Sequence, residues 1–123
     1  MIQHIRLIKW KPGTSEEQIQ AAFDEAKRLP EGIPVVQHVT IGRDRGGSDH
    51  GFTHAVIVQL SREDALDEYL EHPVRRQYVG EVLEPLEEQR IEVDIPVDVA
   101  ARRDPSRNWE WGATAGMGAL PEE

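Results

Sequence analysis

The sequence predicts an α+β fold: a ferredoxin-like, four-stranded antiparallel sheet with helices on one face. Strand and helix patterns follow one another through residues 1–97 in the order β-α-β-β-α-α-β, which is typical of two β-α-β units with antiparallel joins. The central strands are apolar on both faces, and an exposed apolar face needs a partner. We therefore expect a homodimer in which two sheets pack together as a dimeric α/β barrel.

The first half of this region predicts a strand, a helix and a second strand. Residues 3–10 are rich in Ile and Leu and end at a Pro-Gly turn. A helix follows because Ser15 and Gln18 fit a capping box, in which each side chain bonds a free backbone N–H group. Its apolar residues recur on one helical face, and they are Ile19, Ala22, Phe23, Ala26 and Leu29. Residues 35–41 form the second expected strand.

The second half predicts a strand, two helices and a last strand. Residues 51–60 give the clearest strand pattern, and residues 61–72 read as a short helix. A further helix is expected over 73–88. It starts at a proline, whose missing N–H has no partner in a first turn anyway, and Pro85 is expected to bend it. Apolar residues at period two predict the last strand over 90–97.

The composition restricts the classes of function. The chain has 123 residues, of which 23 are acidic and 14 basic, so that its net charge is −9, and it has no cysteine. Phosphate backbones and anionic lipids repel an acidic protein, so we expect no nucleic acid and no membrane partner. The lack of cysteine excludes disulfides, thiol catalysis and cysteine-ligated metals. The N-terminal residues do not resemble a signal peptide, and we expect a cytoplasmic protein.

Residues 98–123 differ from the preceding region. They are polar and turn-like at first and then rich in Gly and Ala, yet they hold Trp109 and Trp111, two of the three tryptophans. Two exposed tryptophans would leave much apolar surface in water. We therefore expect a C-terminal arm that packs on the barrel or on the partner subunit.

Three short motifs resemble one known family. They are residues 4–13 (HIRLIKWKPG), residues 51–54 (GFTH) and residues 69–73 (YLEHP). In this order and spacing they are similar to the stress-responsive A/B-barrel family, also called Dabb, over about residues 2–97. The resemblance implies a ferredoxin-like monomer that dimerises through its sheet. The family includes plant stress proteins and the plant olivetolic acid cyclase, a cofactor-free enzyme whose site lies between the sheet and the helices of one subunit.

Strand alternation places several polar side chains on one face of the predicted sheet. His4, Arg6 and Ile8 share a face of the first strand, and His54 and Val56 share a face of a neighbouring strand. If these faces look toward the helices, Arg6 and the two histidines meet in one cavity. Apolar walls with a few convergent polar groups are typical of a small-molecule site.

Acid–base chemistry is what these residue types would supply. A histidine can take or give a proton near neutral pH. Tyr69 lies on the apolar side of its helix, and its hydroxyl can donate to a developing enolate oxygen in the same space. A buried arginine needs an anionic partner, so Arg6 is expected to bind a carboxylate, either of the protein or of a ligand.

The resemblance implies roles for some of these residues. His4, His54 and Tyr69 match cyclase positions regarded as catalytic, and they are our candidate catalytic residues. Arg75 stands where the cyclase has a histidine that acts as its base, and an arginine cannot do this, which counts against the cyclase reaction itself. The candidate ligand-binding residues are Arg6, Ile8, Val56, His72, Arg75 and Tyr78. No metal site and no cofactor are expected.

The leading hypothesis is a homodimer that binds a small hydrophobic or aromatic carboxylic acid between sheet and helices. If it is an enzyme, the expected reaction is cofactor-free proton transfer next to a carbonyl, of the polyketide cyclase, isomerase or lyase type. The alternatives are a non-catalytic stress or ligand-carrier dimer and a monooxygenase-like barrel. The enzyme hypothesis fails if an internal carboxylate neutralises Arg6 and side chains fill the cavity.

Other charged residues are expected to have structural or solvent-exposed positions. Glu87 and Glu88 read as a solvated helix face. Arg75 is expected to pair with a helix carboxylate such as Glu71 or to lie in solvent. His38 has the parity of the outer sheet face, where the second sheet would pack.

Overall fold

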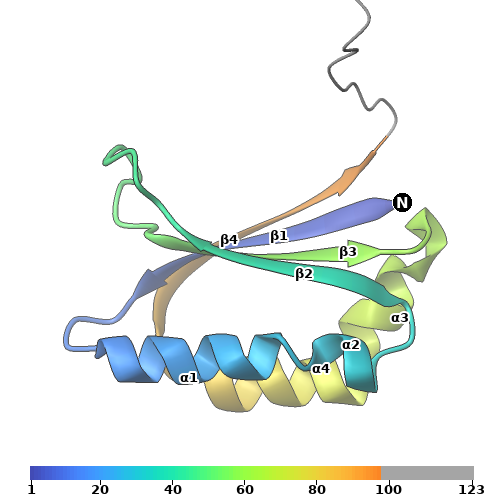
Figure 1. Ribbon diagram of the computed structural model, residues 1–123, viewed down its shortest axis with the longest axis horizontal. Helices are drawn as coiled ribbons and strands as arrows, with labels where there is room; N and C mark the ends of the chain where they lie inside the picture. Colours follow the sequence, from blue (N-terminus) through green and yellow to red (C-terminus); the bar gives the residue numbers. More distant parts are fainter. Residues whose placement is uncertain (98–123) are drawn as a thin grey trace, which may run out of the picture.

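The computed structural model describes residues 1–97 and confirms the ferredoxin-like α+β fold (Figure 1). The elements are β1 (Ile2–Trp10), α1 (Glu16–Ala26), α2 (Leu29–Gly32), β2 (Val36–Arg43), β3 (His54–Leu60), the 3₁₀ turn η1 (Glu63–Ala65), α3 (Leu66–Glu71), α4 (Pro73–Tyr78), the π-helical segment η2 (Val79–Leu83) and β4 (Glu87–Pro96). The expected arm with Trp109 and Trp111 lies outside the described residues.

The four strands form one antiparallel sheet in the order β2-β3-β1-β4. The helices all lie on one face of this sheet, as Figure 1 shows. Strand β1 is central and β4 is an edge strand, so the helix-facing residues of β1 have β3 on one side and β4 on the other. Residues paired across an antiparallel ladder share a face, and His4 is paired with Val58 and with Asp94.

Helix α1 begins as the sequence predicts. The Ser15 hydroxyl accepts a hydrogen bond from the Gln18 backbone N–H at 3.1 Å, and the Gln18 side chain accepts one from the Ser15 N–H at 2.9 Å. The apolar face of α1 is buried through Ile19, Ala22, Phe23 and Ala26. This packing of helix against sheet forms the main core.

The predicted helix over 73–88 is too long. Helix α4 passes into a wider π-helical turn, in which the Glu84 N–H bonds the Val79 carbonyl at 2.8 Å. Pro85 then ends the helical run instead of bending it, because proline has no N–H to continue the pattern. Strand β4 consequently begins at Glu87, three residues earlier than expected. The predicted helix over 61–72 is likewise divided, into η1 and α3.

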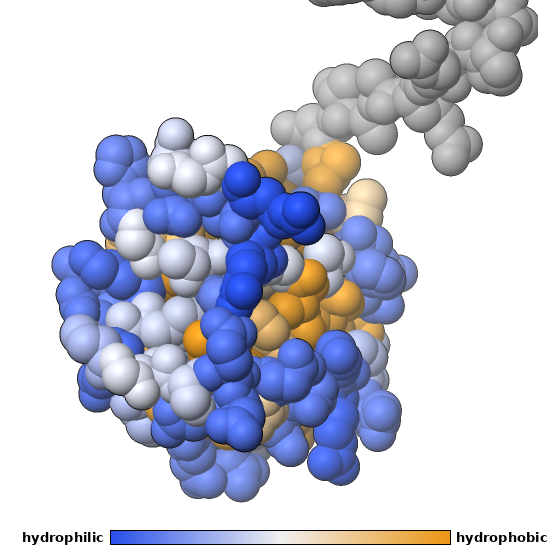
Figure 2. Space-filling model, turned by 60° about the vertical axis from the view of Figure 1, so that its left-hand side comes forward, coloured by the Kyte–Doolittle hydropathy of each residue, from blue (hydrophilic) through white to orange (hydrophobic). Residues whose placement is uncertain are grey.

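The outer face of the sheet carries an apolar surface. Ile91, Val93 and Ile95 of β4 are 43%, 42% and 47% exposed, and their partners across the ladder include Leu7 and Ile5 of β1. Hydrophobic side chains gather in one area of an otherwise hydrophilic surface in Figure 2. The second apolar face expected from the sequence is therefore present on the described residues.

Candidate functional site

The residues named from the sequence fall into two groups on the helix face of the sheet. His4 pairs with Val58 of β3, whereas His54 pairs with Ile8, four residues further along β1. Four residues of a strand span about 13 Å. The expectation that both histidines meet in one cavity is therefore wrong: they share a face but lie at different ends of it.

Arg6 and Glu87 form a buried ion pair. The Arg6 Nε donates to Glu87 Oε2 and its Nη2 donates to Oε1, each at 2.7 Å, and Arg6 is only 3% exposed. Burial alone would lower the pKa of Arg6, but the bond to Glu87 and the surrounding carboxylates outweigh it and raise the pKa. The sequence predicted a solvated helix face for Glu87, and this prediction is wrong. Glu87 is the internal carboxylate that Arg6 requires.

His4 lies between two carboxylates of β4. Its Nδ1 is 2.6 Å from Asp94 Oδ1, and its Nε2 is 3.3 Å from Glu92 Oε1. Carboxylate oxygens accept hydrogen bonds, so a ring that carries both protons can donate to each of them. The ring of His4 also packs beside that of Tyr69, with centroids 5.6 Å apart.

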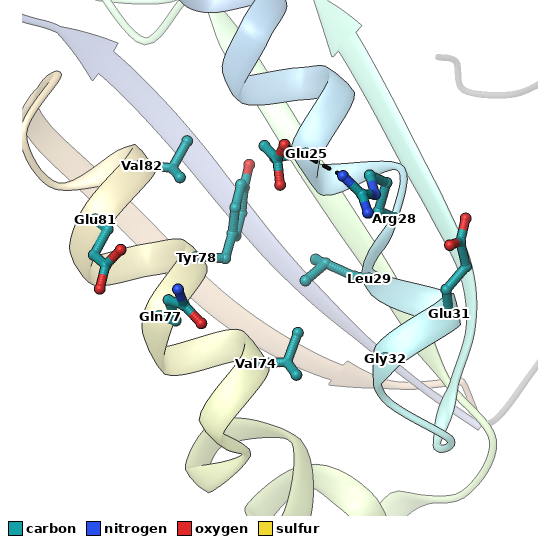
Figure 3. A pocket seen from close by; sticks show the side chains of 10 residues that line it. All are labelled: Glu25, Arg28, Leu29, Glu31, Gly32, Val74, Gln77, Tyr78, Glu81 and Val82. Atoms are coloured by element: carbon teal, nitrogen blue, oxygen red, sulfur yellow. Dashed lines mark ion pairs between the residues drawn. The ribbon is translucent and has the colours of Figure 1, made fainter.

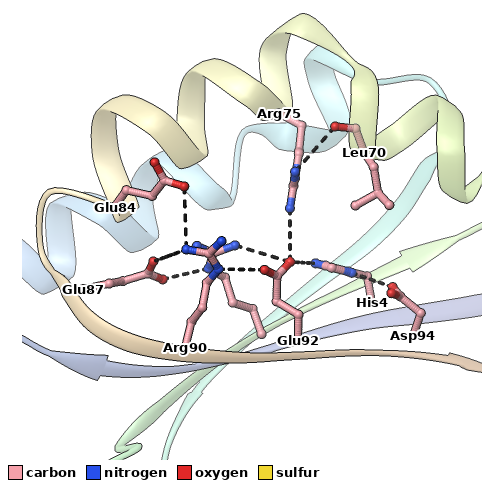
Figure 4. A network of polar contacts seen from close by, with 9 residues as sticks. His4, Leu70, Arg75, Glu84, Glu87, Arg90, Glu92 and Asp94 are labelled. Atoms are coloured by element: carbon pink, nitrogen blue, oxygen red, sulfur yellow. Dashed lines mark hydrogen bonds and ion pairs between the residues drawn. The ribbon is translucent and has the colours of Figure 1, made fainter.

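Glu92 is the centre of the polar network in Figure 4. Besides His4, it contacts Arg75 Nη2 at 3.3 Å, Arg6 Nη1 at 3.6 Å and Arg90 Nε at 2.7 Å. Desolvation on its own would raise the pKa of Glu92, but the bond from Arg90 and the nearby positive groups prevail and lower it. No sequence pattern pointed to Glu92, because its role arises only when β4 pairs with β1.

Tyr69 and Arg75 complete this region from the helices. The Arg75 guanidinium lies over the Tyr69 ring, 5.6 Å from its centroid. Burial raises the pKa of Tyr69, although Arg75 opposes the rise. Arg75 was expected to pair with a helix carboxylate such as Glu71 or to lie in solvent. It pairs instead with Glu92 of β4.

A small cavity lies where these side chains converge, and we call it the His4 chamber. Its volume is about 10 Å³, and its lining residues are His4, Arg6, Val56, Val58, Tyr69, Arg75, Tyr78, Val79 and Leu83. This volume is about that of one water molecule. Two buried nitrogens at the chamber, Arg6 Nη1 and Arg75 Nε, have no hydrogen-bond partner among the described residues.

His54 belongs to a separate cluster near the end of β1. Trp10 Nε1 lies 2.9 Å from its Nδ1, and Arg43 Nε lies 3.1 Å from its Nε2; a neutral imidazole accepts a hydrogen bond at only one of these two nitrogens. Burial first, and then the charge of Arg43, lower the pKa of His54. The cluster borders a different cavity, of about 330 Å³, which Glu16 also lines.

Three other named residues have structural surroundings. Ile8 is fully buried in the main core. His72 is the N-cap of α4, where its Nδ1 accepts from the Val74 N–H at 3.1 Å. The Tyr78 hydroxyl donates to the Ala22 carbonyl at 3.0 Å. Of these three, only Tyr78 reaches the His4 chamber.

A larger groove of about 470 Å³ lies between α1–α2 and α4. Figure 3 shows Leu29, Val74 and Tyr78 between the helices, with Glu31 and Glu81 further out. Of the candidate site residues proposed from the sequence, Tyr78 is the one that lines this groove.

Two further features bear on function. The described part of the chain contains no group of three or more His, Cys, Asp or Glu side chains placed to hold a metal ion. Within residues 1–97, no helix is long and apolar enough to span a membrane.

Comparisons with known proteins agree with this fold. Residues 2–97 match the model of the stress responsive A/B barrel domain, Dabb. No curated protein matches the chain. A dimeric ferredoxin-like protein of unknown function from Thermobifida fusca is 26% identical and has a TM-score of 0.66, over 76% of this chain and 88% of that one.

Two plant structures share the fold at lower identity. At3g17210 from Arabidopsis thaliana is 22% identical, with a TM-score of 0.73 over 82% of this chain and 100% of that one. The hydroxynitrile lyase of Passiflora edulis is 20% identical, with a TM-score of 0.71 over 81% of this chain and 96% of that one. At these identities the likeness shows the fold alone.

Proposed function

The chain belongs to the stress responsive A/B barrel (Dabb) family, and on this premise we propose that it is a cytoplasmic homodimer that binds a small hydrophobic or aromatic carboxylic acid in the His4 chamber. The apolar outer face supports the dimer, because a surface of this kind is stabilised by a second sheet. The Thermobifida fusca protein of the same fold is described as dimeric.

One observation carries the choice of a carboxylate ligand. Arg6 is 3% exposed, yet its Nη1 has no hydrogen-bond partner among the described residues. The buried Nε of Arg75 likewise has no hydrogen-bond partner among them. Arg6 and Arg75 both line the His4 chamber. A buried donor without an acceptor costs about 1–3 kcal/mol, and a carboxylate that accepted from both would remove that cost.

A catalytic role is the second proposal and rests on His4. Asp94 holds Nδ1 at 2.6 Å, and the other ring nitrogen, Nε2, lies 3.3 Å from Glu92 Oε1. A histidine oriented in this way by a carboxylate can exchange a proton with a ligand. Tyr69 would donate from its hydroxyl to an enolate oxygen formed beside the carbonyl. The reaction class would be that of a cyclase, isomerase or lyase.

The enzyme hypothesis loses support from two features. Glu87 already neutralises Arg6, and a chamber of about 10 Å³ is filled by side chains. These are the two conditions under which the enzyme hypothesis was expected to fail. We therefore place ligand binding by a non-catalytic dimer first, with side-chain movement needed to admit the ligand.

Calorimetric titration of the full-length protein tests the proposal. Benzoate and hexanoate are the probes, and benzamide is the neutral control. We expect the two acids to bind and benzamide to bind at least tenfold more weakly. Arg75→Gln should weaken benzoate binding about tenfold, whereas Arg76→Gln, an exposed neighbour on α4, should leave it unchanged. Equal binding of benzoate and benzamide, or no binding of either acid, would show the proposal to be wrong.

A further inference from the structure

We propose that Glu92 is an internal occupant of the carboxylate subsite and that a ligand binds by displacing it. In the unliganded chain the Glu92 carboxylate compensates the charges of the His4 chamber. A ligand carboxylate would take over its contacts while Glu92 turns outward. This inference rests on the proposed binding of a carboxylic acid and names the residue that controls it.

The geometry around one oxygen atom is that of an anion subsite. Glu92 Oε1 lies 3.3 Å from His4 Nε2, 3.3 Å from Arg75 Nη2 and 3.6 Å from Arg6 Nη1. These three groups come from β1 and α4, so they converge on this point from both layers of the fold. Figure 4 shows Arg75 reaching down from the helix toward the Glu92 carboxylate.

Two carboxylates pair with Arg6, which lines the chamber, but they differ in how firmly they are held. The side chain of Glu87 is 4% exposed and makes the two-point pair with Arg6, whereas that of Glu92 is 27% exposed. The other oxygen of Glu92 is held by Arg90, whose side chain is 43% exposed. Glu92 can therefore rotate toward solvent together with Arg90, and Glu87 stays as the permanent counter-ion.

The exit of Glu92 would also provide room. The Arg75–Glu92 pair joins α4 to the edge strand β4 at 3.3 Å, and both side chains are partly exposed at the rim. Since the closed chamber holds only about 10 Å³, no organic acid enters while this pair is in place. Breaking it vacates the volume of a carboxylate side chain beside His4 and Arg75.

The charges define the ligand further. With Glu92 turned outward, Arg6 keeps Glu87 and His4 keeps Asp94. Among residues 1–97, Glu92 is the one carboxylate within ion-pair distance of Arg75. Arg75 is then left without a carboxylate partner among these residues, and a ligand monocarboxylate replaces the lost charge one for one, whereas a dicarboxylate or a phosphate dianion would add a further buried negative charge.

The test is the affinity of benzoate for the full-length protein and for Glu92→Gln, measured by calorimetry and by NMR shifts of the His4 ring nitrogens. Glu63→Gln is the matched control, because Glu63 is an exposed glutamate of η1. Removal of an intramolecular competitor raises apparent affinity. We expect Glu92→Gln to bind benzoate about tenfold more tightly than the unaltered protein does. Its affinity for benzamide should be unchanged, and Glu63→Gln should bind benzoate as the unaltered protein does. Thermal unfolding checks that each variant is folded, and Glu92→Asp, whose carboxylate is drawn back by one methylene, should show a smaller gain.

The two proposals fail in different ways. If the unaltered protein binds benzoate but neither Glu92→Gln nor Glu92→Asp binds it more tightly, Glu92 is not a competitor and the inference is wrong, while the proposed function stands. If none of the proteins binds either acid, the proposed function fails and the inference falls with it. A gain for benzamide equal to that for benzoate would show that Glu92 only obstructs the cavity, which also overturns the inference.

Discussion

Arg6 of β1 and Glu87 at the start of β4 are joined by two hydrogen bonds of 2.7 Å, although 81 positions separate them in the chain. Two parallel bonds between a guanidinium and a carboxylate fix both the distance and the relative orientation of the groups. This pair therefore ties the first residues of the edge strand to the centre of the sheet.

Loss of one partner of this pair should destabilise the protein strongly. Glu87→Gln leaves Arg6 as a buried, uncompensated charge, and removing one member of a buried pair typically costs about 3–5 kcal/mol. Glu88→Gln is the neighbouring control, because Glu88 is 42% exposed and its contact with Lys9 is 3.5 Å long. An exposed pair of that kind contributes at most about 1 kcal/mol. Urea unfolding measures both, and equal losses would contradict the prediction.

The two buried tyrosines should respond differently to loss of the hydroxyl. Tyr78→Phe removes the bond to the Ala22 carbonyl and should lower the free energy of unfolding by about 1 kcal/mol. Tyr69→Phe should have a smaller effect on stability but should weaken benzoate binding at the His4 chamber. Thermal unfolding and calorimetry on both variants separate the roles. Unchanged benzoate binding in Tyr69→Phe would contradict the prediction.

His54 should make stability depend on pH below neutrality. Burial and Arg43 lower its pKa in the folded state below the ordinary 6.5, so the unfolded chain binds the proton more readily. The contribution of His54 is therefore complete above pH 6.5 and is lost as pH falls from 6.5 toward the lowered value. Urea unfolding between pH 7.5 and about pH 4.5 measures it.

The matched variants for this pH dependence are His54→Gln and His50→Gln. His54→Gln should flatten the decline in stability relative to the unaltered protein. His50 lies exposed in the loop between β2 and β3, and His50→Gln should leave the curve as it was. An unchanged curve in His54→Gln would mean that other groups account for the decline.

A charge on the outer face of β4 should separate the proposed dimer. Val93→Asp puts a carboxylate into the apolar surface that also holds Ile91 and Ile95. Light scattering should then give about 13.9 kDa, the mass of one chain, instead of twice that value. Glu71→Lys changes a charge on α3, on the other side of the sheet, and should leave the dimer intact. A monomeric unaltered protein would contradict the proposed dimer itself.

The fold was predictable because its signals are local and repeated. The Ser15–Gln18 capping box and the apolar spacing after it defined α1 from about three successive turns of sequence pattern. The boundary near Pro85 was not predictable in the same way. A proline is compatible with a bent helix and with the end of one, and the outcome depended on the π-helical turn before it.

The candidate site was only partly predictable. Strand parity correctly placed His4 and Arg6 on one face of the sheet. The position of Tyr69 on the apolar side of its helix pointed it toward the same space, and its ring lies beside that of His4. Parity says nothing about position along a strand, so it did not separate His54 from His4. Glu87 and Glu92 were missed because their importance comes from the register between β1 and β4, which connects residues more than 80 positions apart.

Strand β4 alternates in an unusual sense, with charged side chains under the helices and apolar ones on the outer face. Arg90, Glu92 and Asp94 pair across the ladder with Ile8, Arg6 and His4, and Ile91, Val93 and Ile95 lie between them. A slip of one residue would exchange the two sets. Each misaligned form would then bury three charges against the outer apolar surface and leave Arg6 without its counter-ions. The alternation thus favours the correct register when β4 pairs with β1, because a one-residue slip is unfavourable on both faces of the sheet at once.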